Sequence, residues 1–363
     1  MAETFTPAAL VVPGTYIKVQ SEGLIGAGGV STGTIGIVGT AQTGLGDAGT
    51  GDTHLFSSFS EVEPVIGPGD PLSAATLNLN RALDLVFRNG ARVVFARTLP
   101  AGADQADFDA AFAELVKEDI NLVIAPELDT ATALAVLGPV LESAENDGED
   151  LLAVIGSDEP ARDDIEAQVP TNDRVVFTAP GLQAFDAATS EVVDLPGTYT
   201  AAAVAGLLST LQPQASPTNK PLAGITALTQ RFSRGEVASL LGARVCVLDQ
   251  RGIGDVRVVR GLTTDDGGFT QISVRRIVDF AKAGIRKASD PFIGRLNNER
   301  VRKALRGAID GFLTSMLVDE ALTAYELSVT ATRQDEINGR AVVTVLLQPT
   351  FSIDFVTVTL VLQ

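Results

Sequence analysis

Residues 121–156 read NLVIAPELDTATALAVLGPVLESAENDGEDLLAVIG. This stretch decides the fold, because two short apolar segments, 121–125 and 151–156, flank a segment with helical apolar spacing, 130–144. Each apolar segment has the length of a strand that is buried on both faces. A strand, a helix and a second strand in this order predict a parallel pair with the helix as its crossover.

The same alternation continues on both sides of this unit. Further strands are predicted at 34–39, 92–97, 174–178, 244–248 and 256–260, and further helices at 72–89, 107–117, 161–168, 199–211 and 273–285. The predicted fold class is therefore α/β, or α+β over the whole chain, with a mainly parallel sheet and flanking helices.

The carboxyl-terminal part departs from this alternation. Residues 298–318 form the clearest predicted helix, with Asn298 as its N-cap and one apolar face. Two strands follow, 325–332 and 340–348, and the connection between them contains Asn338-Gly339. This pattern predicts an antiparallel hairpin at the carboxyl end of the fold.

Both chain ends look like extended arms. Residues 1–20 include a strand-like run without a sequence neighbour to pair with: Thr15, Tyr16, Ile17, Lys18 and Val19. In the last strand, 351–362, the apolar side chains alternate in one phase and then in the other: Phe351, Ile353 and Phe355, then Val356, Val358, Leu360 and Leu362. Because a one-residue slip moves side chains to the opposite face, this strand either bulges at Phe355-Val356 or leaves one sheet and enters another. The strand is thus either the bulged edge of a hairpin in the monomer or a strand paired with another subunit.

Composition excludes several classes of protein. The 363 residues carry a net charge of −18, which argues against a nucleic-acid binder because such proteins need a basic surface. The sequence contains no apolar run of membrane-spanning length, so no membrane insertion is expected, and its first residues do not have a secretory leader pattern. The single cysteine, Cys246, lies in an apolar run and is expected to be a buried structural thiol.

One segment resembles a cofactor motif. Gly44–Gly49 satisfies G-x-G-x-x-G after an apolar strand, but the residues that follow are turn-like and do not open a helix. The only histidine, His54, cannot form a zinc site with one cysteine and is expected on the surface or at a strand edge. We therefore predict no catalytic residues, no cofactor and no metal site. The alternative is an α/β nucleotide-binding enzyme that uses the Gly44–Gly49 loop.

Positive charge is concentrated in one segment, 275–306. It holds ten basic and three acidic residues, a net of +7, so the remainder of the chain carries −25. The segment is predicted to be either a docking surface for an acidic partner or a solvated helix face. The ten basic residues are Arg275, Arg276, Lys282, Arg286, Lys287, Arg295, Arg300, Arg302, Lys303 and Arg306.

The order of several motifs resembles the contractile tail sheath family, whose members include myophage tail sheaths, R-type bacteriocin sheaths and the sheaths of extracellular contractile injection systems. No single motif is specific, but together they span nearly the whole chain. Two features depart from the family: tryptophan is absent, and Thr15 replaces the usual valine. The matching segments are 13–18 (PGTYIK), 34–39 with the glycine-rich loop after it, 54–62 (HLFSSFSEV), 87–97 (FRNGARVVFAR), 198–222, 272–279, 291–294 and the last three strands.

The resemblance implies a structural subunit and no enzyme. In the family, subunits polymerise helically around an inner tail tube on a baseplate, are closed by a tail terminator, and contract to drive the tube through a target envelope for genome or effector delivery. Terminal arms add strands to neighbouring subunits, and here the matching residues are Thr15–Val19 and Val356, Val358, Leu360 and Leu362. The basic residues expected to face the tube are Arg295, Arg300, Arg302, Lys303 and Arg306. The implied location is a virion tail or injection-system particle assembled in the bacterial cytoplasm.

The expected domains follow from the arms and the strand order. They are an amino-terminal arm at 1–22, a discontinuous core domain at 23–97 and 198–350, an α/β outer part at 98–197 and a carboxyl-terminal strand arm at 351–363. The sequence leaves open whether the particle is a phage, a bacteriocin or a cellular injection system, and which arm pairs with which neighbour.

Overall fold

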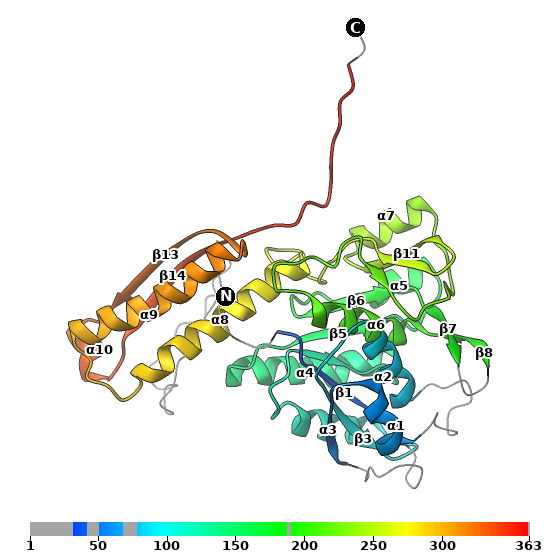
Figure 1. The fold of residues 1–363 in the computed structure, drawn as a ribbon, viewed down its shortest axis with the longest axis horizontal. Coiled ribbons are helices and arrows are strands. Elements are labelled where there is room, and N and C mark those ends of the chain that lie inside the picture. The colour runs from blue at the N-terminus through cyan, green and yellow to red at the C-terminus, as the bar shows by residue number, and fades with distance from the viewer. Residues whose placement is uncertain (1–31, 42–50, 68–77, 187–189, 362–363) are drawn as a thin grey trace. The chain divides into compact units, whose positions relative to one another are not determined.

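The computed structural model describes residues 32–41, 51–67, 78–186 and 190–361 (Figure 1). These residues divide into two compact units. The larger one, called here the sheet unit, contains the described residues from 32 to 275 together with 351–361. The smaller one, called the hairpin unit, contains 276–350. The chain therefore passes between the units at residues 275/276 and again at 350/351.

A nine-stranded sheet forms the centre of the sheet unit. The six strands from β3 to β11 are parallel to one another. At one edge β2 pairs antiparallel with β3, and at the other edge β12 pairs antiparallel with both β11 and β9. This arrangement confirms the predicted mainly parallel sheet. The spatial order is β2 (Thr53–Phe56), β3 (Val94–Leu99), β1 (Ile35–Thr40), β4 (Leu122–Ile124), β5 (Leu152–Gly156), β6 (Val175–Ala179), β11 (Cys246–Gly252), β12 (Asp255–Val258) and β9 (Pro221–Leu222).

Helices cover both faces of this sheet (Figure 1). Strand β5 illustrates the division, because Leu152 and Val154 enter one core and Ala153 and Ile155 enter the other. Helices α2 and α6 approach closely, since a Cβ at Gly206 would lie 2.4 Å from the Val86 carbonyl oxygen. One core takes α1 (Val62–Ile66), α2 (Leu79–Arg88) and α6 (Gly197–Thr210); the other takes α3 (Gln105–Leu115), α4 (Thr130–Asp147), α5 (Arg162–Gln168) and α7 (Arg234–Gly242).

A small antiparallel sheet was not predicted. It has the order β10 (Ala227–Leu228), β7 (Leu182–Asp186) and β8 (Glu191–Leu195). Its strands belong to both the predicted outer part, 98–197, and the predicted core, 198–350, and the large sheet likewise combines strands of both. The subdivision of the chain into a core and an outer part stays a prediction.

The hairpin unit consists of helices and one antiparallel strand pair. Helix α8 (Ile272–Ser289) begins in the sheet unit and continues into the hairpin unit, where η3 (Asp290–Phe292) and α9 (Glu299–Val318) follow. Strands β13 (Leu322–Thr330) and β14 (Val342–Pro349) pair as predicted, with Tyr325 opposite Leu347. Among the described residues, no helix combines the length and apolar character that crossing a membrane requires.

The connection between β13 and β14 differs from the predicted turn. It contains a short helix, α10 (Arg333–Ile337), and a two-residue hairpin loop would leave no room for it. Thr332 and Asp335 form a reciprocal capping box at its start, and Asn338 ends it, followed by Gly339 at φ +67°. Asn338-Gly339 therefore terminates a helix and does not turn a hairpin directly.

Candidate functional site

The carboxyl-terminal arm is the most exposed apolar segment of the described chain. Residues 351–361 form no strand with any other described segment, although their sequence has strand alternation. Val356, Val358 and Leu360 are 81%, 72% and 87% exposed. Leu362 and the predicted amino-terminal arm residues, Thr15–Val19, lie outside the described residues. Neither a bulged hairpin edge nor a second sheet forms at Phe355-Val356 in the described chain.

The β13–β14 sheet offers edges to which a strand can be added. Among the described residues, each of its two strands has only the other as a neighbour, so each presents one outer edge. Helix α9 covers one face, where the Tyr325 hydroxyl donates to Asp310 Oδ1 at 2.8 Å. Exposed edges of this kind can accept a strand from another chain.

The predicted tube-facing residues lie in or just before α9. Arg300, Lys303 and Arg306 are exposed, and Lys303 pairs with Glu299 one turn earlier at 2.7 Å. Arg295 is exposed in the preceding turn, with its guanidinium over the ring of Phe292, 5.4 Å from the ring centroid.

Arg302 differs from these four. It is half-buried, and its Nη1 donates to Glu336 Oε1 at 3.0 Å and to Asn297 Oδ1 at 2.9 Å. Arg302 therefore ties α9 to α10 inside the hairpin unit, whereas the other four predicted residues are exposed.

The rest of the basic segment does not form one surface. Arg275, Arg276 and Lys282 are buried, with exposed fractions of 2%, 6% and 4%. Burial lowers the pKa of the Arg276 guanidinium to about 10, and the nearby Asp279 carboxylate partly opposes this shift. The ten basic residues therefore include structural members as well as exposed ones.

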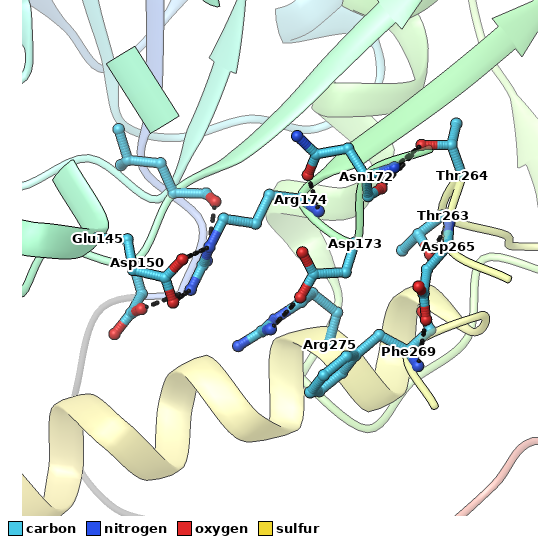
Figure 2. A network of polar contacts seen from close by, with 11 residues as sticks. Glu145, Asp150, Asn172, Asp173, Arg174, Thr263, Thr264, Asp265, Phe269 and Arg275 are labelled. Atoms are coloured by element: carbon cyan, nitrogen blue, oxygen red, sulfur yellow. Dashed lines mark hydrogen bonds and ion pairs between the residues drawn. The ribbon is translucent and has the colours of Figure 1, made fainter. Parts of the chain in front are cut away.

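Arg275 belongs to a polar network at the amino-terminal end of α8 (Figure 2). Its Nη1 lies 2.6 Å from Asp173 Oδ2, and its guanidinium lies over the ring of Phe269 at 4.2 Å. The next residue after Asp173, Arg174, is buried and holds Asp150 at 2.8 Å and Glu145 at 2.7 Å. Figure 2 shows these groups converging from α4, the start of β6 and α8. The network fixes the first turn of α8 to the sheet unit.

The predicted cofactor loop, Gly44–Gly49, lies outside the described residues, but the strand before it is described. In doubly wound sheets a ligand binds where neighbouring parallel strands lead in opposite directions, at their carboxyl ends. Here that place lies between β1 and β4, and Glu127 occupies it. Its carboxylate accepts hydrogen bonds from the Thr40 amide at 2.8 Å and the Thr40 hydroxyl at 2.6 Å. A carboxylate in this position repels phosphate electrostatically.

The histidine and the cysteine considered for a catalytic or metal site, His54 and Cys246, lie within strands of the sheet. His54 lies in β2 at the sheet edge, which confirms the predicted strand-edge histidine. Cys246 is fully buried in β11, and burial raises the pKa of its thiol to about 12, so it is the predicted structural thiol. Within the described ranges, no three of the histidine, cysteine, aspartate and glutamate side chains gather as a metal site.

Comparison with known proteins relates this chain to tail sheath proteins. Residues 264–363, which contain α8, the hairpin unit and the arm, match the family model of the phage tail sheath C-terminal domain. The tail sheath protein of Bacillus phage SP01 is 23% identical over 249 residues, 65% of this chain. The carboxyl-terminal part of the chain, residues 264–363, belongs to the phage tail sheath C-terminal domain family. The alignment spans 43% of the SP01 protein, so this chain corresponds to less than half of that relative.

Solved structures share the fold over nearly the whole chain. The contracted helical sheath of the anti-feeding prophage has a TM-score of 0.74 at 21% identity and covers 97% of this chain and 99% of that one. The contracted sheath complex of the extracellular contractile injection system PVC has a TM-score of 0.73 at 17% identity, covering 99% and 98%. A sheath tail protein from Desulfitobacterium hafniense has a TM-score of 0.66 at 13% identity, covering 87% and 93%.

Proposed function

We propose that this sheath-family chain is the structural subunit of a contractile sheath. It polymerises helically around an inner tube and contracts to drive that tube through a target cell envelope. One observation carries the proposal. The apolar, strand-like segment 351–361 pairs with no described strand, and among the described residues each strand of the β13–β14 sheet has an outer edge without a neighbouring strand. In a polymer, the arm of one subunit can pair with an edge of the β13–β14 sheet of another subunit. In a single molecule, this pairing is not formed among the described residues.

The arm supplies enough free energy to hold neighbours together. Burying the side chains of Val356, Val358 and Leu360 contributes about 1.5–3 kcal/mol each, and each new backbone hydrogen bond adds about 0.5–1.5 kcal/mol. The acceptor we propose is an edge of the β13–β14 sheet of another subunit. Such head-to-tail contacts generate a helical array when the rotation from one subunit to the next does not close a ring. Thr15–Val19 and Leu362 are proposed to take part in the same way.

The exposed basic residues of the hairpin unit are proposed to face the inner tube. Arg295, Arg300, Lys303 and Arg306 are solvent-accessible, and Arg302 supports them by holding α9 to α10. Attraction between exposed charges weakens with salt, so assembly on the tube is expected to be salt-sensitive. Charge reversal at Arg300 and Arg306 tests this directly, because neither side chain has an ion pair within the described residues.

Contraction needs no chemical reaction in this proposal. Two packings of the same subunit that differ in free energy are sufficient, with the contracted one more stable. The chain then acts without catalysis, which agrees with Glu127 occupying the place where a nucleotide phosphate binds in related folds. Baseplate and terminator proteins are the expected further partners. The expected location is a phage tail or injection-system particle assembled in the bacterial cytoplasm.

The decisive experiment compares a triple variant and a double variant of the arm by negative-stain microscopy and sedimentation. Wild-type protein is expected to form ridged tubes or stacked rings. Replacing Val356, Val358 and Leu360 with threonine should leave soluble subunits with an unchanged circular dichroism spectrum. Replacing Thr357 and Thr359 with serine alters the opposite phase of the same segment and should leave polymers intact. Wild-type protein that stays in small uniform particles, or a threonine variant that still polymerises, contradicts the proposal.

A further inference from the structure

The root of the arm is attached to its own sheet unit by a buried carboxylate. The side chain of Asp354 is only 6% exposed. Its Oδ2 accepts from Arg260 Nε at 2.6 Å and from Gln271 Nε2 at 3.1 Å, and its Oδ1 accepts from the Ser352 hydroxyl at 3.1 Å. Charge-assisted bonds of this kind are among the strongest polar contacts in proteins.

Gln271 also holds the backbone of the root. Its Oε1 accepts from the Ser352 amide at 3.1 Å, and its Nε2 contacts the Ser352 carbonyl oxygen at 3.4 Å. One side-chain amide thus satisfies both backbone groups of Ser352, as a neighbouring strand would. The Arg260 guanidinium adds a contact with the ring of Phe355 at 5.2 Å.

The side chains of the root alternate between attached and exposed. Ser352 and Asp354 face the sheet unit, whereas Phe351, Ile353 and Phe355 are 60%, 82% and 77% exposed. Ser352 and Asp354, the attached positions of this alternation, are polar. The next position of the same alternation, Val356, is apolar. The alternation of apolar residues therefore changes phase, at Phe355-Val356, where the contacts with the subunit's own sheet unit end.

The contacts of Gln271, Ser352 and Asp354 lie close in sequence to the two places where the chain passes between the units, 275/276 and 350/351. Gln271 immediately precedes α8, whose first turn Arg275 fixes to Asp173 before the chain enters the hairpin unit at 275/276. The chain returns at 350/351 and is held at once through Ser352 and Asp354. Gln271, which shortly precedes the first passage along the chain, thus contacts Ser352, which shortly follows the second.

We propose that Asp354, Arg260 and Gln271 form an arm latch that holds 351–355 on the subunit's own sheet unit. In this arrangement Asp354 is a positioning residue. It fixes where the free strand begins and in which direction it leaves, so that only the residues from Val356 onward are given to a neighbour. The attachment itself follows from the contacts above, and its purpose in assembly rests on the proposed function.

A distance measurement in unpolymerised full-length protein tests the latch without any sheath. Spin labels are attached at Ile353→Cys, whose side chain points away from the latch, and at Asp164→Cys on α5. The native Cys246 is buried and stays unlabelled. With the latch intact, pulsed electron paramagnetic resonance should give one narrow distance. Asp354→Ala should give a roughly twofold broader distribution, because a freed segment samples many orientations.

Two further variants make the test specific. Gln271→Leu keeps the side-chain size but removes both backbone contacts, and it should also broaden the distribution. Asp255→Ala removes a chemically matched pair on β12, Asp255 with Arg257 Nε at 2.7 Å, and should leave the distribution narrow. An unchanged narrow distance in both latch variants would overturn the proposal, as would a broad distance in the unmodified chain.

The role in assembly has a separate readout. Asp354→Ala should raise the critical concentration for polymerisation roughly tenfold, because only a fraction of free arms point correctly, while Asp255→Ala should not change it. An unchanged critical concentration in a variant with a freed root would overturn the positioning role. If wild-type protein does not polymerise at all, the proposed function fails, and the distance measurement still decides whether the latch exists.

Discussion

Arg174→Ala is expected to destabilise the sheet unit strongly. The Arg174 side chain is 4% exposed and its guanidinium contacts Asp150, also 4% exposed, Glu145 and the Leu151 carbonyl oxygen. Removing one partner of a buried pair leaves the other charge in a desolvated place, which costs about 3–5 kcal/mol. In a unit of this size, about 2–4 °C of melting temperature is lost per kcal/mol, so the expected shift is about 6–20 °C.

The matched control is Arg257→Ala. Arg257 holds Asp255 at 2.7 Å through Nε, but both side chains are about a third exposed. Exposed pairs of this kind contribute about 0–1 kcal/mol. Both variants are compared with wild type by thermal melts and urea titrations under conditions that prevent polymerisation. Equal shifts for the two variants, or a shift below that of the control for Arg174→Ala, would refute the assignment of a structural role to the network in Figure 2.

Three further outcomes are expected. Hydrogen bonds from Thr332 and the Arg340 guanidinium lower the pKa of Asp335 to about 2, so its contribution to stability is present above about pH 4 and is lost as the pH falls towards 2; the difference in urea midpoint between wild type and Asp335→Asn should shrink over that range. Cys246, whose pKa is about 12, should not react with a thiol reagent at pH 8 until the protein unfolds, and rapid labelling of folded protein would contradict its burial. Gly284→Ala should cost about 1–3 kcal/mol, because its new Cβ would meet the Phe312 ring, whereas Gly311→Ala on the open side of α9 should stabilise by about 0.5–1 kcal/mol in the same melts.

The sequence predicts the central fold well because its strands are buried on both faces. Runs such as Leu152–Gly156 are apolar throughout and are bounded by helices, so their type and order follow from the pattern alone. The strands missed in β7 and β8 are short, and the exposed Phe185 and Val192 interrupt their alternation. Strength of pattern, and not position in the chain, separates the elements that were predicted from those that were not.

Short helices were missed although their start signals are present. Ser233 and Glu236 form a capping box at the start of α7, as Thr332 and Asp335 do at α10. Both patterns can be read directly in the sequence. In the second case the Asn338-Gly339 pair also favours a turn, so the local sequence is compatible with both a hairpin loop and a short helix.

The exposed alternation of the carboxyl-terminal arm was predictable, but its attachment to the sheet unit was not. Exposed alternation at 351–361 follows from local sequence, whereas the pairing of Asp354 with Arg260 joins residues 94 positions apart. Nothing local distinguishes Arg260 from the other arginines of the chain. For the same reason the basic segment could be counted from sequence, yet the burial of Arg275 and the pairing of Arg302 could not.

The order of contacts along the carboxyl-terminal arm also determines where mechanical load enters the molecule. Tension applied beyond Val356 reaches Asp354 before it reaches Thr350, and Asp354 passes it to Arg260, two residues after the end of β12. The tension is thus transferred to the edge region of the nine-stranded sheet, and it does not separate strands β13 and β14. In the proposed sheath, tension from a neighbouring subunit would therefore act on the sheet unit before it acts on the hairpin unit.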